Sequence, residues 1–251
     1  MLLRALGSFL LEASAGTSLL LVFYPHRVLG KGFFALHGLI ASIFLAVSAL
    51  AFPGRETWVG SIAALAPLVL YTLLVRSQPP PRAIPWLVVS ASIQLAVLAR
   101  VSGASGPAPG AWIFGGNLLG GLLFGSVLLT MNLGHWYLVS RSLPLSLLFR
   151  AAVAFAALAG GRAVYLLVAA LADPNPAGWE ALTSLDRDLL FFLFRVLWGI
   201  AGPVALSYYV FQTSKMRSNQ AATGLLYVAL IFVLIGELLS SYLTVLTRFP
   251  A

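Results

Sequence analysis

Residues 222–246 read ATGLLYVALIFVLIGELLSSYLTVL, an apolar run that contains a single charged residue, Glu237. A helix needs about 20 such residues, each rising 1.5 Å, to cross the hydrocarbon core of a bilayer. The run is therefore long enough to span a membrane. Placing a charged group in lipid costs free energy, so the presence of Glu237 in this run must be explained separately.

The composition of the whole chain extends this conclusion. Of its 251 residues, 60% are hydrophobic and only 9% are charged, against roughly 25% charged residues in an ordinary soluble domain. So few charges cannot cover a water-facing surface, and the apolar excess is expected to face lipid. The absence of cysteine excludes disulfides, thiolate metal sites and cysteine nucleophiles. We expect an all-α, polytopic transmembrane helix bundle that forms one integral membrane domain over residues 1–251.

Seven further segments match this run in length and polarity. Turn residues separate them, as in Asp173-Pro174-Asn175-Pro176. The eight predicted spans are approximately residues 4–24, 32–52, 57–75, 84–102, 111–135, 145–171, 188–212 and 222–246. The first span has no separate basic region before it, so we interpret it as a retained span rather than a signal peptide.

The charges of the loops predict how the chain is oriented. The odd-numbered loops contain basic residues without acidic ones, whereas acidic residues gather on the sixth loop. The basic residues are Arg27, Lys31, Arg76, Arg82, Arg141, Lys215 and Arg217, and the acidic ones are Asp173, Glu180, Asp186 and Asp188. The positive-inside rule then places the odd loops in the cytoplasm and both termini outside. We therefore attribute the net charge of +8 to orientation in a bacterial cytoplasmic membrane, and not to nucleic-acid binding.

Four ionisable residues lie deep inside the predicted spans. They are Glu12, Arg162, Arg195 and Glu237. Counted from the outer ends of their spans at 1.5 Å per residue, all four lie roughly 10–14 Å below the outer surface. An ionisable side chain at the bilayer centre costs roughly 2.5–3.5 kcal/mol on insertion scales, so it should face protein and have a partner. Two acids and two bases at one level can neutralise each other, which predicts one polar cluster in the outer half of the bundle.

Two aromatic residues accompany the buried arginines. Tyr165 follows Arg162 by three positions, and Trp198 follows Arg195 by three, so each ring lies near its arginine on the helix surface. Either ring can pack against a flat ligand.

The cluster has a functional and a structural interpretation. Intramembrane ionisable residues usually serve a function, and buried ion pairs are weak stabilisers compared with apolar contacts. The functional hypothesis is a quinone-type site, in which Glu12 or Glu237 accepts the proton and an arginine of the cluster holds the partial negative charge of the reduced ring. In the structural hypothesis, the same charges only fix helix packing.

Two histidines lie near the opposite, cytoplasmic side of the predicted bundle. His37 begins the second span and His135 ends the fifth. Two imidazoles on different helices at similar depth can hold a b-type haem between them, so this pair is the candidate set of metal ligands. Glycines from Gly115 to Gly125 would let a flat ring approach the fifth span, although such spacing is also a common helix-packing device.

The sequence contains no HExxH metalloprotease motif and no phosphate-binding GxxxxGK[ST] motif. The leading hypothesis is an integral membrane subunit of a respiratory-type electron-transfer complex. It would work with other protein subunits, because little of the chain lies outside the bilayer. Two alternatives stay open: a small transporter or lipid-handling protein that uses the charges as a gate, and a structural or assembly subunit.

Overall fold

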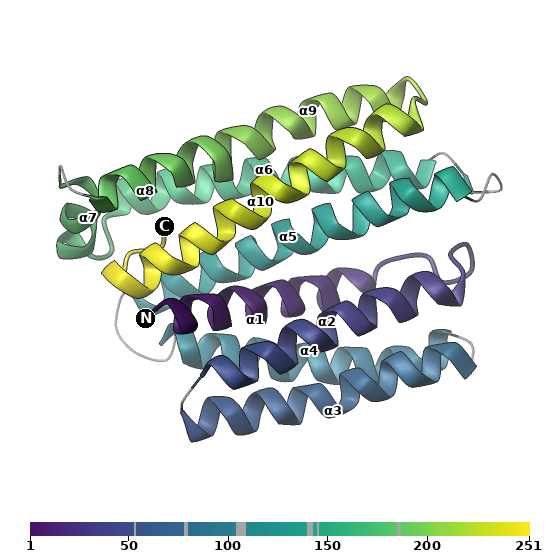
Figure 1. Cartoon of the computed structure of the whole chain (residues 1–251), viewed down its shortest axis with the longest axis horizontal. Helices are drawn as coiled ribbons and strands as arrows, with labels where there is room; N and C mark the ends of the chain where they lie inside the picture. Colours follow the sequence, from purple (N-terminus) through teal and green to yellow (C-terminus); the bar gives the residue numbers. More distant parts are fainter. Residues whose placement is uncertain (53, 78–79, 104–108, 140–142, 145, 185–186) are drawn as a thin grey trace. The chain divides into compact units, whose positions relative to one another are not determined.

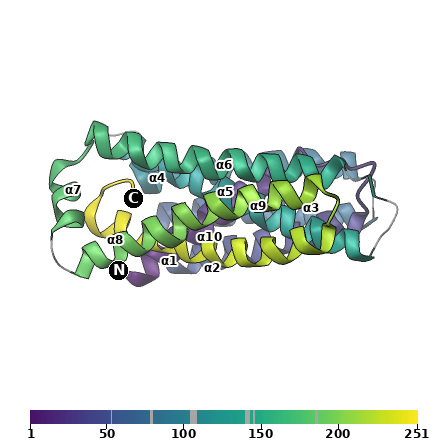
Figure 2. The same ribbon diagram turned by 90° about the horizontal axis from the view of Figure 1, so that it is seen from above.

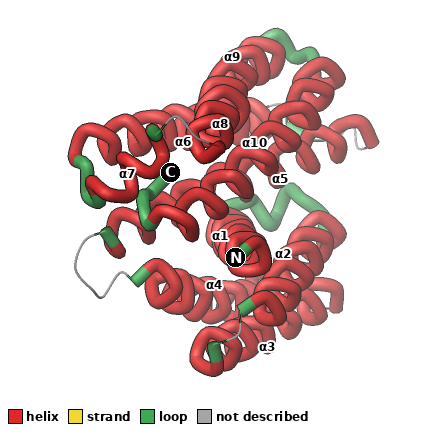
Figure 3. Tube along the Cα trace, turned by 60° about the vertical axis from the view of Figure 1, so that its left-hand side comes forward, coloured by secondary structure: helices red, strands yellow, loops and turns green. Residues whose placement is uncertain are grey.

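The computed structural model describes residues 1–52, 54–77, 80–103, 109–139, 143–144, 146–184 and 187–251. All regular structure in this part of the chain is helical (Figures 1 and 3). It divides into two compact units, Met1–Gly125 and Ser126–Ala251. The expectation of one membrane domain over the whole chain stays a prediction.

The N-terminal unit is built on a four-helix bundle. Its helices are α1 (Leu2–Leu21), α2 (Lys31–Ala51), α3 (Arg55–Ser77) and α4 (Pro80–Ser102), followed by the first half of α5 (Gly110–Val139). α1 packs against α2, α2 against α3 and α3 against α4, and α1 also packs against α4, which closes the bundle (Figure 1). Short connections make neighbouring helices antiparallel, as in other up-and-down bundles.

The C-terminal unit contains the second half of α5 and the remaining helices. These are α6 (Ser146–Ala172), α7 (Pro176–Thr183), α8 (Arg187–Val196), the π-helical turn η1 (Leu197–Ala201), α9 (Gly202–Lys215) and α10 (Asn219–Thr247). The last helix packs along α7, α8, η1 and α9, while α6 packs against η1 and α9 (Figure 2). α10 is therefore the element that touches most of this unit.

Seven helical segments of the described chain are long and apolar enough to cross a membrane. They are Lys31–Ala51, Arg55–Ser77, Arg82–Ser102, Gly110–Tyr137, Ser146–Ala172, Leu189–Lys215 and Asn219–Thr247. Each coincides with a predicted span, which confirms an all-α, polytopic integral membrane protein in contact with a lipid bilayer.

The eighth predicted span, residues 4–24, corresponds to α1, which is not among these seven. The helix has 20 residues, but Arg4, Glu12 and several hydroxyl residues make it more polar than the others. Every residue from Gly7 to Ser18 is buried, so the middle of this helix is covered by protein. The predicted orientation, with both termini outside, depends on whether α1 crosses and stays a prediction. The predicted orientation rests on the charges of the loops. Of these, Arg141 and Asp186 lie outside the described residues, as does the side chain of Asp188.

Glycines let α1 and α5 approach closely within the N-terminal unit. A Cβ atom on Gly16 would lie 1.9 Å from the carbonyl oxygen of Gly121, and one on Gly125 would lie 2.7 Å from the carbonyl carbon of Gly16. No side chain fits at these positions, so this part of the glycine-rich fifth span serves as a helix-packing surface.

The predicted span 188–212 is one helical rod with a widened turn at its centre. Pro203 has no backbone N–H and cannot make the usual bond to the carbonyl of Gly199. The N–H of Gly202 instead donates to the Leu197 carbonyl, five residues back, which defines the π-helical turn. Such turns commonly occur at functional sites. Neither this turn nor the short helix α7, which begins at Pro176, was expected from hydropathy.

Candidate functional site

A carboxylate lies between two guanidinium groups in the interior of the C-terminal unit. Arg195 Nη2 is 3.0 Å from Glu237 Oε1, and Arg162 Nη2 is 3.3 Å from Glu237 Oε2. The Nε of Arg162 also donates to Oε1, at 3.4 Å. All three side chains are at most 1% exposed. We call this group the Arg–Glu–Arg triad.

The triad forms because its members sit at one level of three helices. Arg162 lies ten residues before the end of α6, Glu237 ten residues before the end of α10, and Arg195 eight residues after the start of α8. At 1.5 Å per residue, these positions are roughly 12–15 Å from the same end of the unit. Three of the four residues expected to form one cluster are thus in contact.

The fourth expected member, Glu12, belongs to the N-terminal unit. Its side chain is buried in α1, and the hydroxyl of Ser8, one helical turn earlier, donates to its Oε1 at 2.9 Å. The structure describes it within that unit only, so its membership of the cluster stays a prediction.

Two glycines bring Arg195 and Glu237 together. A Cβ on Gly236 would lie 2.2 Å from the Cα of Gly199, which belongs to the π-helical turn. The backbones of α10 and η1 therefore touch directly, and the residues beside the two glycines face each other at short range. The sequence analysis assigned Gly236 no packing role; its position immediately before a buried charge is the signal that could have indicated one.

The last residues of the described chain fold back over the triad. Arg248 adopts a left-handed conformation, with φ 58°, and turns the chain back at the end of α10. Phe249 and Ala251 are buried as a result. The carbonyl oxygen of Ala251 accepts hydrogen bonds from Arg162 Nη2, at 2.7 Å, and from the hydroxyl of Ser240. Sequence patterns gave no sign of this contact.

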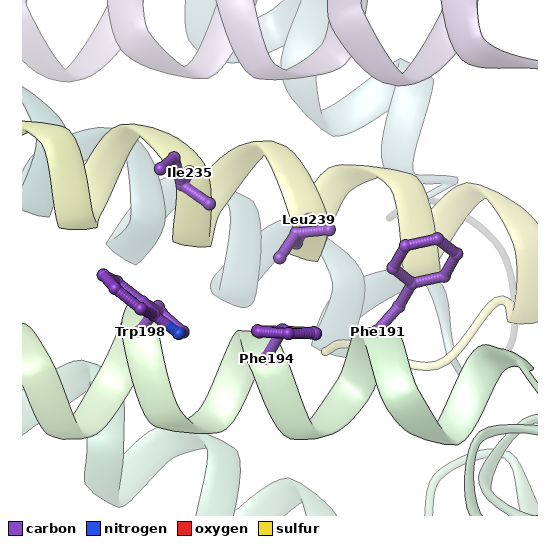
Figure 4. Close-up of a pocket in the computed structure, with 5 residues that line it drawn as sticks. All are labelled: Phe191, Phe194, Trp198, Ile235 and Leu239. Atoms are coloured by element: carbon purple, nitrogen blue, oxygen red, sulfur yellow. The ribbon is translucent and has the colours of Figure 1, made fainter.

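An aromatic groove of about 280 Å³ lies between α8, η1 and α10. Its lining is wholly apolar and consists of Phe191, Phe194, Trp198, Ile235 and Leu239 (Figure 4). Arg195 directly follows Phe194, and Glu237 lies between the two α10 residues of the lining. The groove therefore runs along the outside of the same helical turns whose inner side carries the triad.

The two aromatic residues expected beside the arginines have different surroundings. Trp198 lies in the groove and packs edge-on against Phe232, with ring centroids 4.6 Å apart. Tyr165 lies on α6, with its ring centroid 6.0 Å from the Arg162 guanidinium carbon. Only Trp198 lines the groove.

The predicted haem ligands lie in different units. His37 is fully buried in the N-terminal unit, and its Nδ1 donates to the Phe33 carbonyl at 2.7 Å. This bond leaves Nε2 as the nitrogen that points away from the helix, as in many metal-ligating histidines. His135 is exposed on α5 in the C-terminal unit. Among the described residues, no group of three or more His, Asp and Glu is placed to hold a metal ion.

A third histidine sits between α1 and α2. The His26 ring packs against Phe34, with centroids 4.4 Å apart. Burial lowers the pKa of His26 from its ordinary value of 6.5, and the backbone of Val22 opposes this shift only in part. His26 therefore favours its neutral form in the folded protein.

Comparisons of the chain with known protein families, with curated proteins and with solved structures gave no match.

Proposed function

We propose that this protein is a membrane subunit of a respiratory-type electron-transfer complex, and that it binds a quinone-type ring in the aromatic groove beside the Arg–Glu–Arg triad. The observation that carries the proposal is the shared position of groove and triad on α8, η1 and α10. The same turns of two apolar helical segments thus carry an aromatic surface on one side and a buried charged group on the other.

The groove suits a flat ring with an isoprenoid tail. Phe194 and Trp198 offer aromatic faces, against which a ring can stack in an offset arrangement. The volume of about 280 Å³ lies just below the usual range for ligand sites, which begins at roughly 300 Å³. It would hold the ring and leave the tail among the lipid chains.

The triad would supply the polar chemistry. A reduced quinone ring carries partial negative charge on its oxygens, which a guanidinium such as that of Arg195 can stabilise. The carboxylate of Glu237 would take up a proton as general base. The π-helical turn next to Arg195 is the place where a small backbone change would bring the guanidinium toward the groove.

A quinone site exchanges electrons with a second redox carrier. We expect either a b-type haem held by His37 and His135, or a redox centre in another protein subunit. The described helices leave little chain outside the bilayer, which favours partner subunits. The expected location is the cytoplasmic membrane of a bacterium.

One observation favours a structural or assembly subunit as the second candidate. Both oxygens of the Glu237 carboxylate already accept hydrogen bonds from arginines, as in ion pairs that only tie helices together. The two candidates differ in what Glu12→Gln and Glu237→Gln should do. A quinone site loses turnover per assembled complex, even where less complex assembles. A purely structural role lowers only the amount of complex and leaves the turnover of what remains unchanged.

Photoaffinity labelling of the purified protein in lipid nanodiscs tests the quinone site directly. An azido-quinone should label peptides within residues 187–201 and 219–247, and an excess of unlabelled quinone should suppress the labelling. Trp198→Leu and Phe194→Leu should each reduce specific labelling about tenfold, which corresponds to 1.4 kcal/mol of binding free energy. Leu193→Ala changes an exposed α8 residue outside the groove and is the matched control. Labelling that is equal in all variants, or not suppressed by unlabelled quinone, would refute the proposal.

A further inference from the structure

The carbonyl oxygen of Ala251 occupies a small pocket of hydrogen-bond donors. Arg162 Nη2 reaches it at 2.7 Å, and the Ser240 hydroxyl donates to the same oxygen. Both donors are buried, with Arg162 1% exposed and Ser240 4% exposed. Two buried donors, one of them charged, that converge on one oxygen are typical of a site for an oxyanion.

The donors of Arg162 are only partly used. Its Nη2 contacts three acceptors: Glu237 Oε2, Ser240 Oγ and the Ala251 carbonyl. Its Nη1 is buried and has no hydrogen-bond partner among the described residues. A guanidinium presents its N–H groups as a fork that matches two oxygens of one anion. A second oxygen beside the position of the Ala251 carbonyl would therefore find a donor that nothing in the described chain satisfies.

The segment that fills this pocket is short, and contacts with α6, α7 and α10 hold it there. Phe249 packs against Trp179 of α7, with ring centroids 5.1 Å apart. The N–H of Ala251 donates to Thr244 Oγ1 at 3.4 Å, a long bond. Arg248 turns the chain with a positive φ, which residues other than glycine rarely adopt. Because α10 ends at Thr247, a rearrangement of Arg248–Ala251 need not unwind this helix.

We propose that Arg162 and Ser240 form a binding site for one carboxylate- or phosphate-type oxyanion, and that residues 248–251 close this site as an internal substitute for the anion. Withdrawal of the segment opens the pocket from the end of the unit where α7 lies. This site is on the α6 side of the triad, away from the aromatic groove, and it does not depend on quinone binding.

The test removes the internal substitute and supplies the anion from outside. A variant that ends at Arg248 should melt at a lower temperature than the full chain in phosphatidylcholine nanodiscs. Sodium phosphate or acetate should restore the melting temperature in a saturable way, by roughly 2–4 °C, because a ligand that binds only the folded state stabilises it. Sodium chloride at equal ionic strength controls for screening.

Two further arms identify the residues and the source of the anion. Arg162→Gln in the shortened chain should abolish the rescue, whereas Arg100→Gln, an exposed arginine in the other unit, should leave it intact. Rescue by phosphatidylglycerol nanodiscs without added anion would identify a lipid headgroup as the source, and rescue only by dissolved anions would identify a free ligand. If the shortened chain does not fold, Phe249→Ala loosens the same segment and takes its place. Absence of rescue by every anion, or equal rescue with Arg162→Gln, would overturn the proposal.

Discussion

Gly199 and Gly236 meet backbone to backbone, so closely that a Cβ on Gly199 would lie 2.6 Å from the Cα of Gly236. One glycine belongs to the π-helical turn and the other to the centre of α10. Their contact sets the distance between these elements, and the Arg195–Glu237 ion pair forms beside it.

Replacing Gly236 by alanine should separate the two elements. The added methyl group has no room, so the helices must shift, and overpacking of this kind typically costs about 1–3 kcal/mol. Thermal unfolding in detergent would measure the loss. Gly224→Ala on the same helix is the matched control, because a Cβ at Gly224 meets nothing within 4 Å. Equal effects of the two substitutions would show that the close approach is unimportant.

Glu237→Gln should destabilise the C-terminal unit. It leaves two buried guanidinium groups facing a neutral amide, and breaking a buried ion pair on one side costs about 3–5 kcal/mol. Chemical denaturation or the yield of folded protein would report the change. Glu56→Gln is the control, since the Glu56–Arg100 pair is exposed and such pairs contribute little. A Glu237→Gln variant as stable as the wild type would mean that the triad is not a stabilising unit.

Acidification should lower the free energy of unfolding, because it protonates His26 in the unfolded chain first. The folded state lowers the pKa of this imidazole below 6.5, so the unfolded chain binds its proton more tightly. Stability is then complete above about pH 6.5 and falls as the pH drops toward the folded-state pKa. His26→Asn should flatten the fall in melting temperature below about pH 6.5. Lys31→Gln removes a nearby charge but no imidazole and should keep the wild-type slope; identical slopes in all three proteins would exclude His26 as the cause.

A reduced-minus-oxidised absorbance spectrum of the purified protein tests the haem hypothesis. Ligation by His37 and His135 predicts sharp b-type bands that disappear on replacing either residue with alanine, while His26→Ala retains them. A featureless spectrum would remove haem from the proposal. It would leave the quinone site, a transporter and a structural subunit as the candidates, and quinone labelling would separate them.

The absence of cysteine makes the orientation easy to test. Ala177→Cys places a thiol on α7, in the sixth loop, and Ser218→Cys places one in the seventh; both positions are exposed. The positive-inside rule predicts that a membrane-impermeant maleimide labels the first in intact cells and the second only after permeabilisation. The opposite pattern would place the triad in the cytoplasmic half of the membrane.

Hydropathy alone located the seven confirmed spans, because the preference of apolar residues for lipid is a local property of each segment. It also placed Arg162, Arg195 and Glu237 at one depth, since depth follows from residue count along a helix of constant rise. Counting residues along a helix could not show that the middle of α1 is buried. Its polar residues are stabilised by contacts with residues distant in the sequence, which a local pattern does not reveal.

Only the tertiary structure shows which charged side chains form ion pairs with each other. Which oxygen of Glu237 meets which arginine depends on how closely α10 and η1 pack. Gly199 and Gly236, which are far from each other in the sequence, set this distance, together with Pro203 after the π-helical turn. The return of Ala251 to Arg162 depends on a left-handed Arg248, which no periodic pattern signals. The sequence by itself therefore determined which segments are long and apolar enough to span a membrane, and that three of their charges lie at one level. Only the tertiary structure decided which charges meet, because interhelical contacts are set by side-chain volume and backbone geometry rather than by polarity.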